Sequence, residues 1–431
     1  MYHSSQRRNR NRIIYLLLLR ARHRAHRRLG QQKIAALVSL ARLAKISSLI
    51  QRRSRYRFLL RRHLPPSPRH GTSWVSIRES FDDQAYLITT GLDVASFEYI
   101  LDSGFERWWN THTIVREDVD EDGVPRLQRR SLPADGALGL VLHWLTSAST
   151  ESELSLIFAL VPSVVSRYIY FGLQILLHLL RRLPESQITW PSEDEMTYFA
   201  ELIQRRHPTI DGAFGFIDGL SLPVETSSDP REQEVMYNGW LHSHRIGNIF
   251  VFAPDGRIIA CKLNAPGSWH DARIARDVYR KLIHNTPEGF FLIGDTAFQS
   301  EELANKIHTP LKEGNILPED RAERVATIEY SNQLTQARQA VEWGMRSIQS
   351  VFNRLRVPLS IHNPVGRQRL LETCARLHNL RATCMGINEI RSVYARERNL
   401  PYVLREEAYN MLFPRLHAHN RVGRFYLENE E

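Results

Sequence analysis

Residues 214–219 read FGFIDG and residues 289–295 read GFFLIGD. Each stretch is a short apolar run that ends in an acid, Asp218 in the first and Asp295 in the second. Such runs predict buried strands. If the two strands are neighbours, the two carboxylates at their carboxyl ends converge. These stretches therefore predict a sheet with a pair of acids at one edge.

The segments around these strands predict the rest of the domain. A hairpin is expected from Ile246 to Leu263 around the turn Pro254-Asp255-Gly256, and with the first strand it forms an antiparallel meander. Helices are expected over 271–283, 330–355 and 367–385, with strand 289–294 after the first of them. Three strands, a helix, a strand and further helices make up the ribonuclease-H-like plan. We therefore expect an α/β fold, a mixed sheet with flanking helices, over residues 210–390.

The acids of this plan predict a metal site. Asp218 and Asp295 end the first and fourth strands, and Glu342 lies on the late helix. Three such carboxylates can hold two hard divalent cations about 4 Å apart, which activate water and stabilise the leaving oxygen of a phosphodiester. Mg²⁺, or Mn²⁺, suits these oxygen ligands. The alternative is structural, because Asp-Gly after a strand is a common turn and Glu342 can be a surface acid.

Residues 86–109 and 136–183 have helical periodicity, with an acidic loop from Glu117 to Gly123 between them, so residues 80–195 are expected to form an all-helical domain. Within it, Glu151 to Leu180 contains a short amphipathic helix, a break at Val161-Pro162 and a second helix that Ser163 is placed to cap. This is a helix-turn-helix pattern, in which Ser163, Ser166 and Arg167 would face DNA from the first turns of the second helix. A helical hairpin that only packs into a bundle fits the same pattern.

The charge is concentrated at the N-terminus. Residues 1–70 hold 19 of the 57 Lys and Arg residues and no acid, which leaves 38 basic against 47 acidic residues in the remainder. This partly helical or disordered arm, whose end contains the linker Pro65-Pro66-Ser67-Pro68, suits binding to a polyanion or nuclear import, and a disordered segment without a nucleic-acid role is a further alternative. A mitochondrial transit peptide is the alternative. Residues 391–431 form a C-terminal extension.

Several classes of protein are disfavoured. Cys261, Cys374 and Cys384 form no CxxC pair, so neither a zinc knuckle nor a disulfide scaffold is expected. The longest apolar stretch, 154–180, contains Pro162, Arg167 and other polar residues, so no membrane span is expected. The sequence contains no GxxxxGK[ST], GxGxxG or GxSxG motif, which disfavours nucleotide-dependent enzymes and serine hydrolases.

Four motifs in order resemble one family. They are Phe216-Ile217-Asp218-Gly219, Gly267-Ser268-Trp269-His270-Asp271, Leu292-Ile293-Gly294-Asp295-Thr296-Ala297-Phe298 and Arg338-Gln339-Ala340-Val341-Glu342. Together they resemble the DDE transposase domain of the PIF/Harbinger group, which includes Harbinger-derived nucleases. The resemblance covers roughly residues 135–385, including Leu377-His378-Asn379, and does not cover the arginine-rich arm.

This resemblance implies a nuclear, metal-dependent DNA endonuclease or transposase with Asp218, Asp295 and Glu342 as the metal-binding triad. His270-Asp271 also matches a family motif, so Asp271 is the alternative acid, although it stands where a helix begins and could cap it. The resemblance further implies a separate Myb-like DNA-binding partner, and it leaves open a homo-oligomer and a cytoplasmic pool. The rival hypothesis is a domesticated, catalytically silent protein that binds DNA or a protein partner.

Overall fold

The computed structural model describes residues 16–22, 40, 42, 43, 45, 59–114, 123–312 and 314–395. The chain divides into two compact units, Met1–His63 and Leu64–Glu431. In the first unit, residues 16–22 are helical and exposed, and a 3₁₀ turn covers Arg61–His63. Most of the arginine-rich arm and of the C-terminal extension lies outside the described residues, so the roles expected for them remain predictions.

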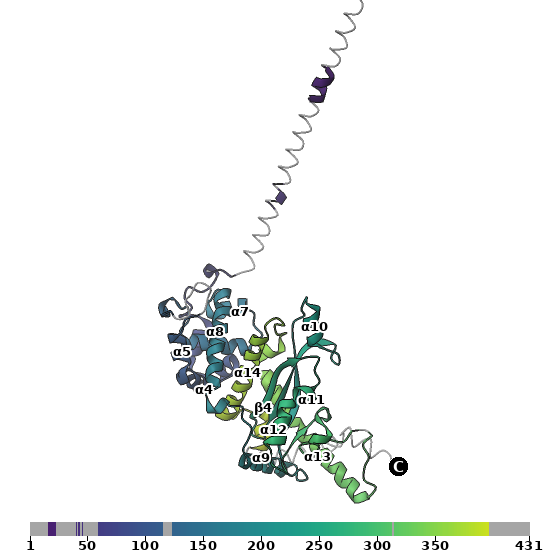
Figure 1. The fold of residues 1–431 in the computed structure, drawn as a ribbon. Helices are drawn as coiled ribbons and strands as arrows, with labels where there is room; N and C mark the ends of the chain where they lie inside the picture. Colours follow the sequence, from purple (N-terminus) through teal and green to yellow (C-terminus); the bar gives the residue numbers. More distant parts are fainter. Residues whose placement is uncertain are drawn as a thin grey trace, which may run out of the picture. The chain divides into compact units, whose positions relative to one another are not determined.

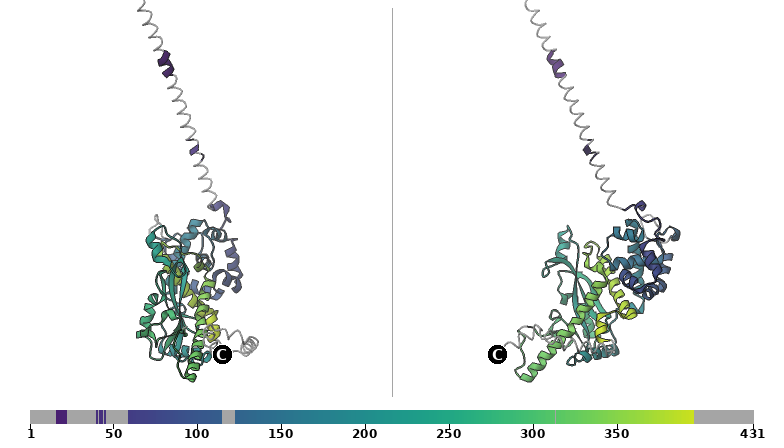
Figure 2. Two further views of the ribbon diagram at one scale, coloured as in Figure 1. Left: turned by 90° about the vertical axis from the view of Figure 1, so that its right-hand side faces the viewer. Right: turned by 180° about the vertical axis from the view of Figure 1, so that it is seen from behind.

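The second unit begins with helices, which lie beside the sheet in Figures 1 and 2. They are α2 (Ser73–Ser80), α3 (Asp83–Thr90), α4 (Val94–Ile100), the π-helix η2 (Leu101–Phe105), α5 (Glu106–Thr111), η3 (Leu127–Arg129), α6 (Ala134–Thr146), α7 (Glu151–Phe158), α8 (Pro162–Leu180), η4 (Pro184–Ser186) and α9 (Glu193–Arg206). Thr72, Asp82, Asp93, Thr150 and Ser192 cap helix N-termini with their side chains. Side-chain caps of this kind satisfy backbone N–H groups that a helix leaves unpaired.

The expected helix, break and second helix are present as α7 and α8, but the expected cap is wrong. Helix α8 begins at Pro162, and its N-cap is Val161, which makes no side-chain cap. Proline suits the first helical position because the N–H that it lacks would be unpaired there. Ala159 ends α7 in a left-handed conformation, with φ of 52°.

Helix α8 is long and apolar enough, by length and composition alone, to cross a membrane. However, 61% of its most apolar stretch is buried inside the protein. This burial is typical of the core helix of a folded domain.

The sheet has the strand order β4-β3-β1-β5-β6, with the two-residue β2 paired at the end of β3. Strands β1, β3 and β4 are antiparallel neighbours, whereas β5 and β6 run parallel to β1. The strands are β1 (Ala213–Pro223), β2 (Tyr237–Asn238), β3 (Ser243–Phe252), β4 (Ile258–Pro266), β5 (Phe291–Gly294) and β6 (Ile307–His308). This mixed sheet with flanking helices confirms the expected ribonuclease-H-like fold.

The remaining helices flank the sheet. They are α10 (Pro230–Met236), α11 (Asp271–Ile274), α12 (Arg276–His284), η5 (Thr296–Phe298), η6 (Glu301–Leu303), α13 (Arg321–Val351), η7 (Asn353–Arg356), α14 (Pro364–Leu380), the π-helix η8 (Arg381–Met385) and α15 (Glu389–Tyr394). Helix α13 begins nine residues before the expected start at residue 330, because Asp320 caps it there with its side chain. The expected helix over 271–283 is interrupted at Ala275.

The two faces of the sheet bury different clusters. Phe216, Leu220 and Leu222 of β1 pack in a cluster with side chains of α13 and α14, whereas Ile217 packs with those of α9, α11 and α12. This alternation follows from the two-residue period of a strand. It places Asp218 on the same face of β1 as Phe216 and Leu220, the face that α13 covers.

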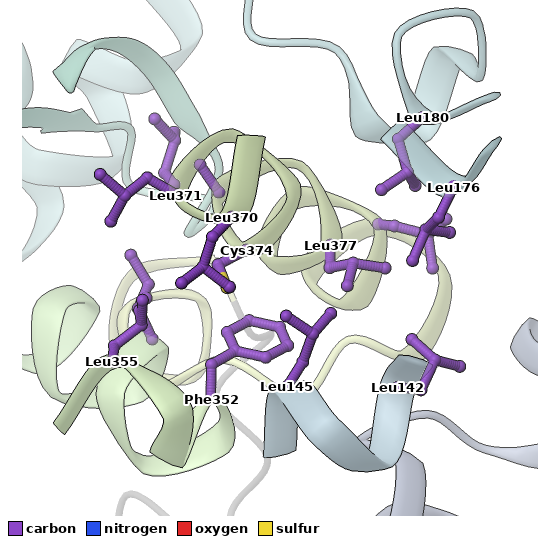
Figure 3. Close-up of a cluster of buried hydrophobic side chains, with 14 of the residues drawn as sticks. Leu142, Leu145, Leu176, Leu180, Phe352, Leu355, Leu370, Leu371, Cys374 and Leu377 are labelled. Carbon is purple, nitrogen blue, oxygen red and sulfur yellow. The ribbon is translucent and has the colours of Figure 1, made fainter. Parts of the chain in front are cut away.

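The helical segment and the sheet share one core. Figure 3 shows Leu142 and Leu145 of α6 and Leu176 and Leu180 of α8 around Leu377 of α14 and Phe352. Arg354 strengthens this junction, because its guanidinium donates to the backbone oxygens of Trp144 and Ser149. The helical segment is therefore part of the same compact unit as the sheet, while the expected boundary near residues 195–210 stays a prediction.

Asn379 joins α14 to the start of β4. Its Oδ1 accepts the Ile258 N–H at 2.7 Å, and its Nδ2 donates to the oxygens of Ile258 at 2.8 Å and Gln187 at 2.7 Å. The side chain is fully buried. The Asn379 side chain therefore makes the two backbone hydrogen bonds with Ile258 that a neighbouring strand would otherwise make.

We expect Asn379→Leu to lower the free energy of unfolding by about 3 kcal/mol, because three buried backbone groups lose their partner. Urea unfolding at unchanged m-value measures the loss. Asn285→Leu, at an exposed position at the end of α12, is the control and should change stability by less than about 0.5 kcal/mol. Equal effects of the two substitutions would contradict this role of Asn379.

Candidate active site

Asp218 and Asp295 are brought together by the parallel pairing of β1 and β5. Ile217 pairs with Gly294 in this register, so Asp218 and Asp295 are the next residues on the two strands. The expectation that these strands are neighbours is confirmed. However, Asp218 does not end its strand, because β1 continues to Pro223 beside β3. Only β5 ends at the acid.

Backbone groups hold both carboxylates. Oδ1 of Asp218 accepts the Gly219 N–H at 2.7 Å. Oδ1 of Asp295 accepts the Thr296 N–H at 2.8 Å and caps the 3₁₀ turn η5. Each carboxylate thus has one oxygen fixed by its own backbone and a second oxygen that these bonds leave available.

Asp271 approaches the pair from the other face of the sheet. A Cβ placed on Gly219 would lie 2.7 Å from Oδ2 of Asp271, so only glycine at 219 gives this carboxylate room. Asp271 is the first residue of α11, and the N-cap residue, His270, is exposed and makes no side-chain cap. Asp271 is therefore directed toward β1.

Glu342 lies on α13, on the face of the sheet opposite Asp271, and it is linked to Asp218 through Arg338. Ala340, Val341 and Gly344 of this helix are buried, and a Cβ on Gly344 would lie 2.8 Å from the Phe252 ring. The close packing fixes α13 against the sheet, although the Glu342 side chain remains 52% exposed.

Arg338 lies between Asp218 and Glu342. Its Nη1 is 3.8 Å from Oδ2 of Asp218, and its Nη2 is 3.6 Å from Oε1 of Glu342, one helical turn further along α13. Sequence reasoning gave this arginine no role, although the four-residue spacing of Arg338 and Glu342 on a helix is the signal for such a pair.

The acids perturb one another. Burial raises the pKa of Asp218 to about 6; the Gly219 N–H and Arg338 oppose this shift, and the charges of Asp295 and Asp271 add to it. Burial likewise raises the pKa of Asp271, with a smaller upward contribution from Asp295. An acid surrounded by other acids in a poorly solvated position is typical of a cation site.

The donors fit a hard divalent cation. Carboxylate oxygens are the ligands that Mg²⁺ and Mn²⁺ prefer. The guanidinium of Arg338 provides the positive charge between the carboxylates of Asp218 and Glu342. As the side chains are placed, no three His, Cys, Asp or Glu residues of the described part of the chain come close enough together to hold a metal ion. The ligands expected from the sequence, Asp218, Asp295 and Glu342, would hold the ion only after their side chains move closer together.

A cavity of about 410 Å³ lies between α12 and η6. Tyr279 lines it, and burial together with the charge of Asp271 raises the pKa of Tyr279 to about 12. Arg276, Arg280, Ser300 and Glu302 also line this cavity. Sequence reasoning missed these residues, because neither arginine belongs to a motif.

The three residues expected to contact DNA lie together on the first turns of α8, where Ser163 is exposed. The Ser166 hydroxyl donates to Oε1 of Glu151 at 2.6 Å, and Nε of Arg167 donates to the Ser163 carbonyl at 3.0 Å. The first contact joins α8 to α7, and the second lies within α8. DNA binding by the three residues stays a prediction.

The raised pKa of Asp218 predicts that this residue destabilises the metal-free fold. Above pH 6 the folded protein carries a buried charge that costs about 3 kcal/mol, and well below pH 4 the side chain is protonated in both states and the cost disappears. We expect Asp218→Asn to raise the free energy of unfolding by about 3 kcal/mol at pH 8 in EDTA, and by much less at pH 4.

Urea unfolding at the two pH values measures this difference. Asp211→Asn, at an exposed aspartate just before β1, is the matched control and should be neutral. If Asp218→Asn lowers the free energy of unfolding at pH 8, the ionised Asp218 carboxylate does not destabilise the fold.

Comparison with known proteins agrees with this geometry. No curated protein and no solved structure matches the chain. Residues 217–379 match the family model described as DDE superfamily endonuclease. The match begins one residue before Asp218, ends at Asn379 and contains all four acids of the site. This part of the chain is thus similar to the DDE superfamily endonucleases, and the similarity supports a nuclease- or transposase-type function.

Proposed function

We propose that the protein is a divalent-metal-dependent DNA endonuclease or transposase of the PIF/Harbinger type. One observation carries the proposal: the parallel register of β1 and β5, which makes Asp218 and Asp295 neighbours at the end of β5. The match to DDE superfamily endonucleases over residues 217–379 supports the reaction class. The finer assignment rests on the order of four sequence motifs.

In this proposal Asp218, Asp295 and Glu342 hold Mg²⁺ or Mn²⁺. The bound metal supplies the activation of water and the stabilisation of the leaving 3′-oxygen. The residues of the chain provide the rest: Gly219 and Thr296 orient the two aspartates through their N–H groups, and α13 carries the third acid. DNA hydrolysis requires no covalent intermediate with the protein.

The proposal also covers features outside the acid site. Nuclear localisation and a Myb-like DNA-binding partner follow from the resemblance to the PIF/Harbinger group, whereas the basic N-terminal arm lies outside that resemblance. The arm's 19 basic residues without an acid support contact with a polyanion. A homo-oligomer would bring two acid sites to the two ends of a DNA element.

Nicking of supercoiled plasmid tests the enzyme. Purified protein should nick in Mg²⁺ or Mn²⁺ and not in EDTA, and Asp295→Asn should lower the rate at least about 100-fold because a metal ligand is lost. Asp211→Asn is the matched control and should nick at the wild-type rate. Equal nicking by wild type and Asp295→Asn would indicate a contaminating nuclease and would favour the binding-protein hypothesis.

The third ligand is tested by a pair of variants. Glu342→Gln should abolish nicking as fully as Asp295→Asn does, whereas Asp271→Asn should retain a measurable metal-dependent rate because Asp271 only adjoins the ligands. Initial rates across a Mn²⁺ titration measure both. The reverse order of activities would place Asp271, and not Glu342, in the triad.

In this proposal the cavity beside Tyr279 contacts the DNA backbone through Arg276. Arg276 is exposed, and Arg280 pairs with Asp277 at 2.7 Å. We expect Arg276→Gln to weaken DNA binding and to lower the slope of log affinity against log salt by about 1, because one phosphate contact is lost.

Glu302 supplies a comparison of opposite sign, because it lines the same cavity. Glu302→Gln should strengthen binding, since it removes a charge that repels phosphate. Fluorescence anisotropy with a short labelled duplex at several salt concentrations measures both variants. If both change affinity in the same direction, the cavity does not contact the backbone.

A further inference from the structure

The contacts of Arg338 are ion pairs without hydrogen bonds. Its distances to Asp218 and Glu342, 3.8 Å and 3.6 Å, exceed ordinary donor–acceptor distances for charged groups. In contrast, Arg181 holds Glu372 through two hydrogen bonds of 2.8 Å and 2.6 Å. The guanidinium of Arg338 is therefore held near the carboxylates of Asp218 and Glu342 by electrostatic attraction and by its place on α13, without hydrogen bonds.

The helix explains this position. Ala337 and Val341 on either side of Arg338 are buried against the sheet, so the side chain leaves α13 along its half-buried edge and is itself only 27% exposed. Among the described residues, Arg338 is the one cation within ion-pairing distance of Asp218 or Glu342. It is the local counter-charge for Asp218 and Glu342.

A metal ion bound by Asp218 and Glu342 would need the space that the Arg338 guanidinium occupies. Asp218 and Glu342 lie on opposite sides of one guanidinium, and within the described part of the chain no three potential ligands converge on one point. A dication between the same carboxylates would repel the guanidinium at close range, because both carry positive charge in a poorly solvated space.

We propose that Arg338 is a displaceable internal counter-ion, whose guanidinium must leave Asp218 and Glu342 before a divalent cation can bind between them. The inference rests on the proposed metal-dependent function. It assigns to Arg338 the role of setting the metal concentration at which the site fills. The expected effect of removing its charge is an affinity for the cation raised roughly tenfold, because two half-exposed ion pairs no longer compete.

Calorimetric titration of Mn²⁺ into wild type and Arg338→Gln at pH 8 tests the proposal. Gln keeps most of the aliphatic stem and removes only the charge. Arg321→Gln, five turns earlier on α13 and exposed, is the matched control with the same loss of charge, and it should bind as wild type does. Thermal unfolding in EDTA establishes that each variant is folded.

The proposal is supported if Arg338→Gln binds Mn²⁺ more tightly than wild type and Arg321→Gln do. This includes the case in which binding by Arg338→Gln is measurable and binding by wild type is too weak to measure. Equal or weaker binding by Arg338→Gln would overturn it while leaving the metal-dependent function intact. If none of the three proteins binds Mn²⁺, both this inference and the proposed function fail.

A second measurement needs no variant and so remains informative if Arg338→Gln does not fold. Phenylglyoxal modifies accessible arginines, and mass spectrometry quantifies the modification of Arg338 and Arg321 in the same sample. Saturating Mg²⁺ should raise the modification rate of Arg338 several-fold, because the released side chain is more accessible, and should leave that of Arg321 unchanged. An unchanged or lower rate at Arg338 would overturn the proposal.

Discussion

The parallel pairing of β1 with β5 is the constraint on which the rest of the site depends. It fixes two aspartates side by side at the end of β5, where their charges repel. The sheet can carry this repulsion because apolar side chains cover both of its faces and because backbone N–H groups hold one oxygen of each carboxylate. Burial of the apolar side chains on these faces stabilises the fold by more than the repulsion between the carboxylates destabilises it.

The other two acids approach this pair from opposite faces. Asp271 comes from α11 through the space that Gly219 leaves, and Glu342 comes from α13 beside the Arg338 guanidinium. A strand alternates its side chains between the two faces, so Asp218 faces α13 whereas Gly219 faces α11. The position of one short motif thus determines which elements contribute to the site.

Sequence reasoning found the parts of this structure that local pattern determines. The four longer strands, their order and the pairing of the two acid-bearing strands were predictable, because buried strands and their periodicity are visible in the residues, whereas the two-residue strands β2 and β6 and the short helix α10 were expected to be loops. The extent of β1 past Asp218 was not, because its pairing with residues 245–250 of β3 is a tertiary contact. The roles of Arg338 and Gly219 were missed for the same reason: each depends on what an element distant in sequence places opposite it.

The core shared by α6, α8, α14 and the end of α13 constrains how the protein can meet DNA. Side chains from both segments interlock without an intervening linker, and Arg354 ties α13's end to the loop after α6. Because this segment is packed onto the sheet, it cannot move as an independently tethered domain. If α8 contacts DNA, as the sequence predicts, the base pairs that it contacts would lie at one set distance and angle from Asp218, and the fold would determine the offset between contacted and cleaved positions.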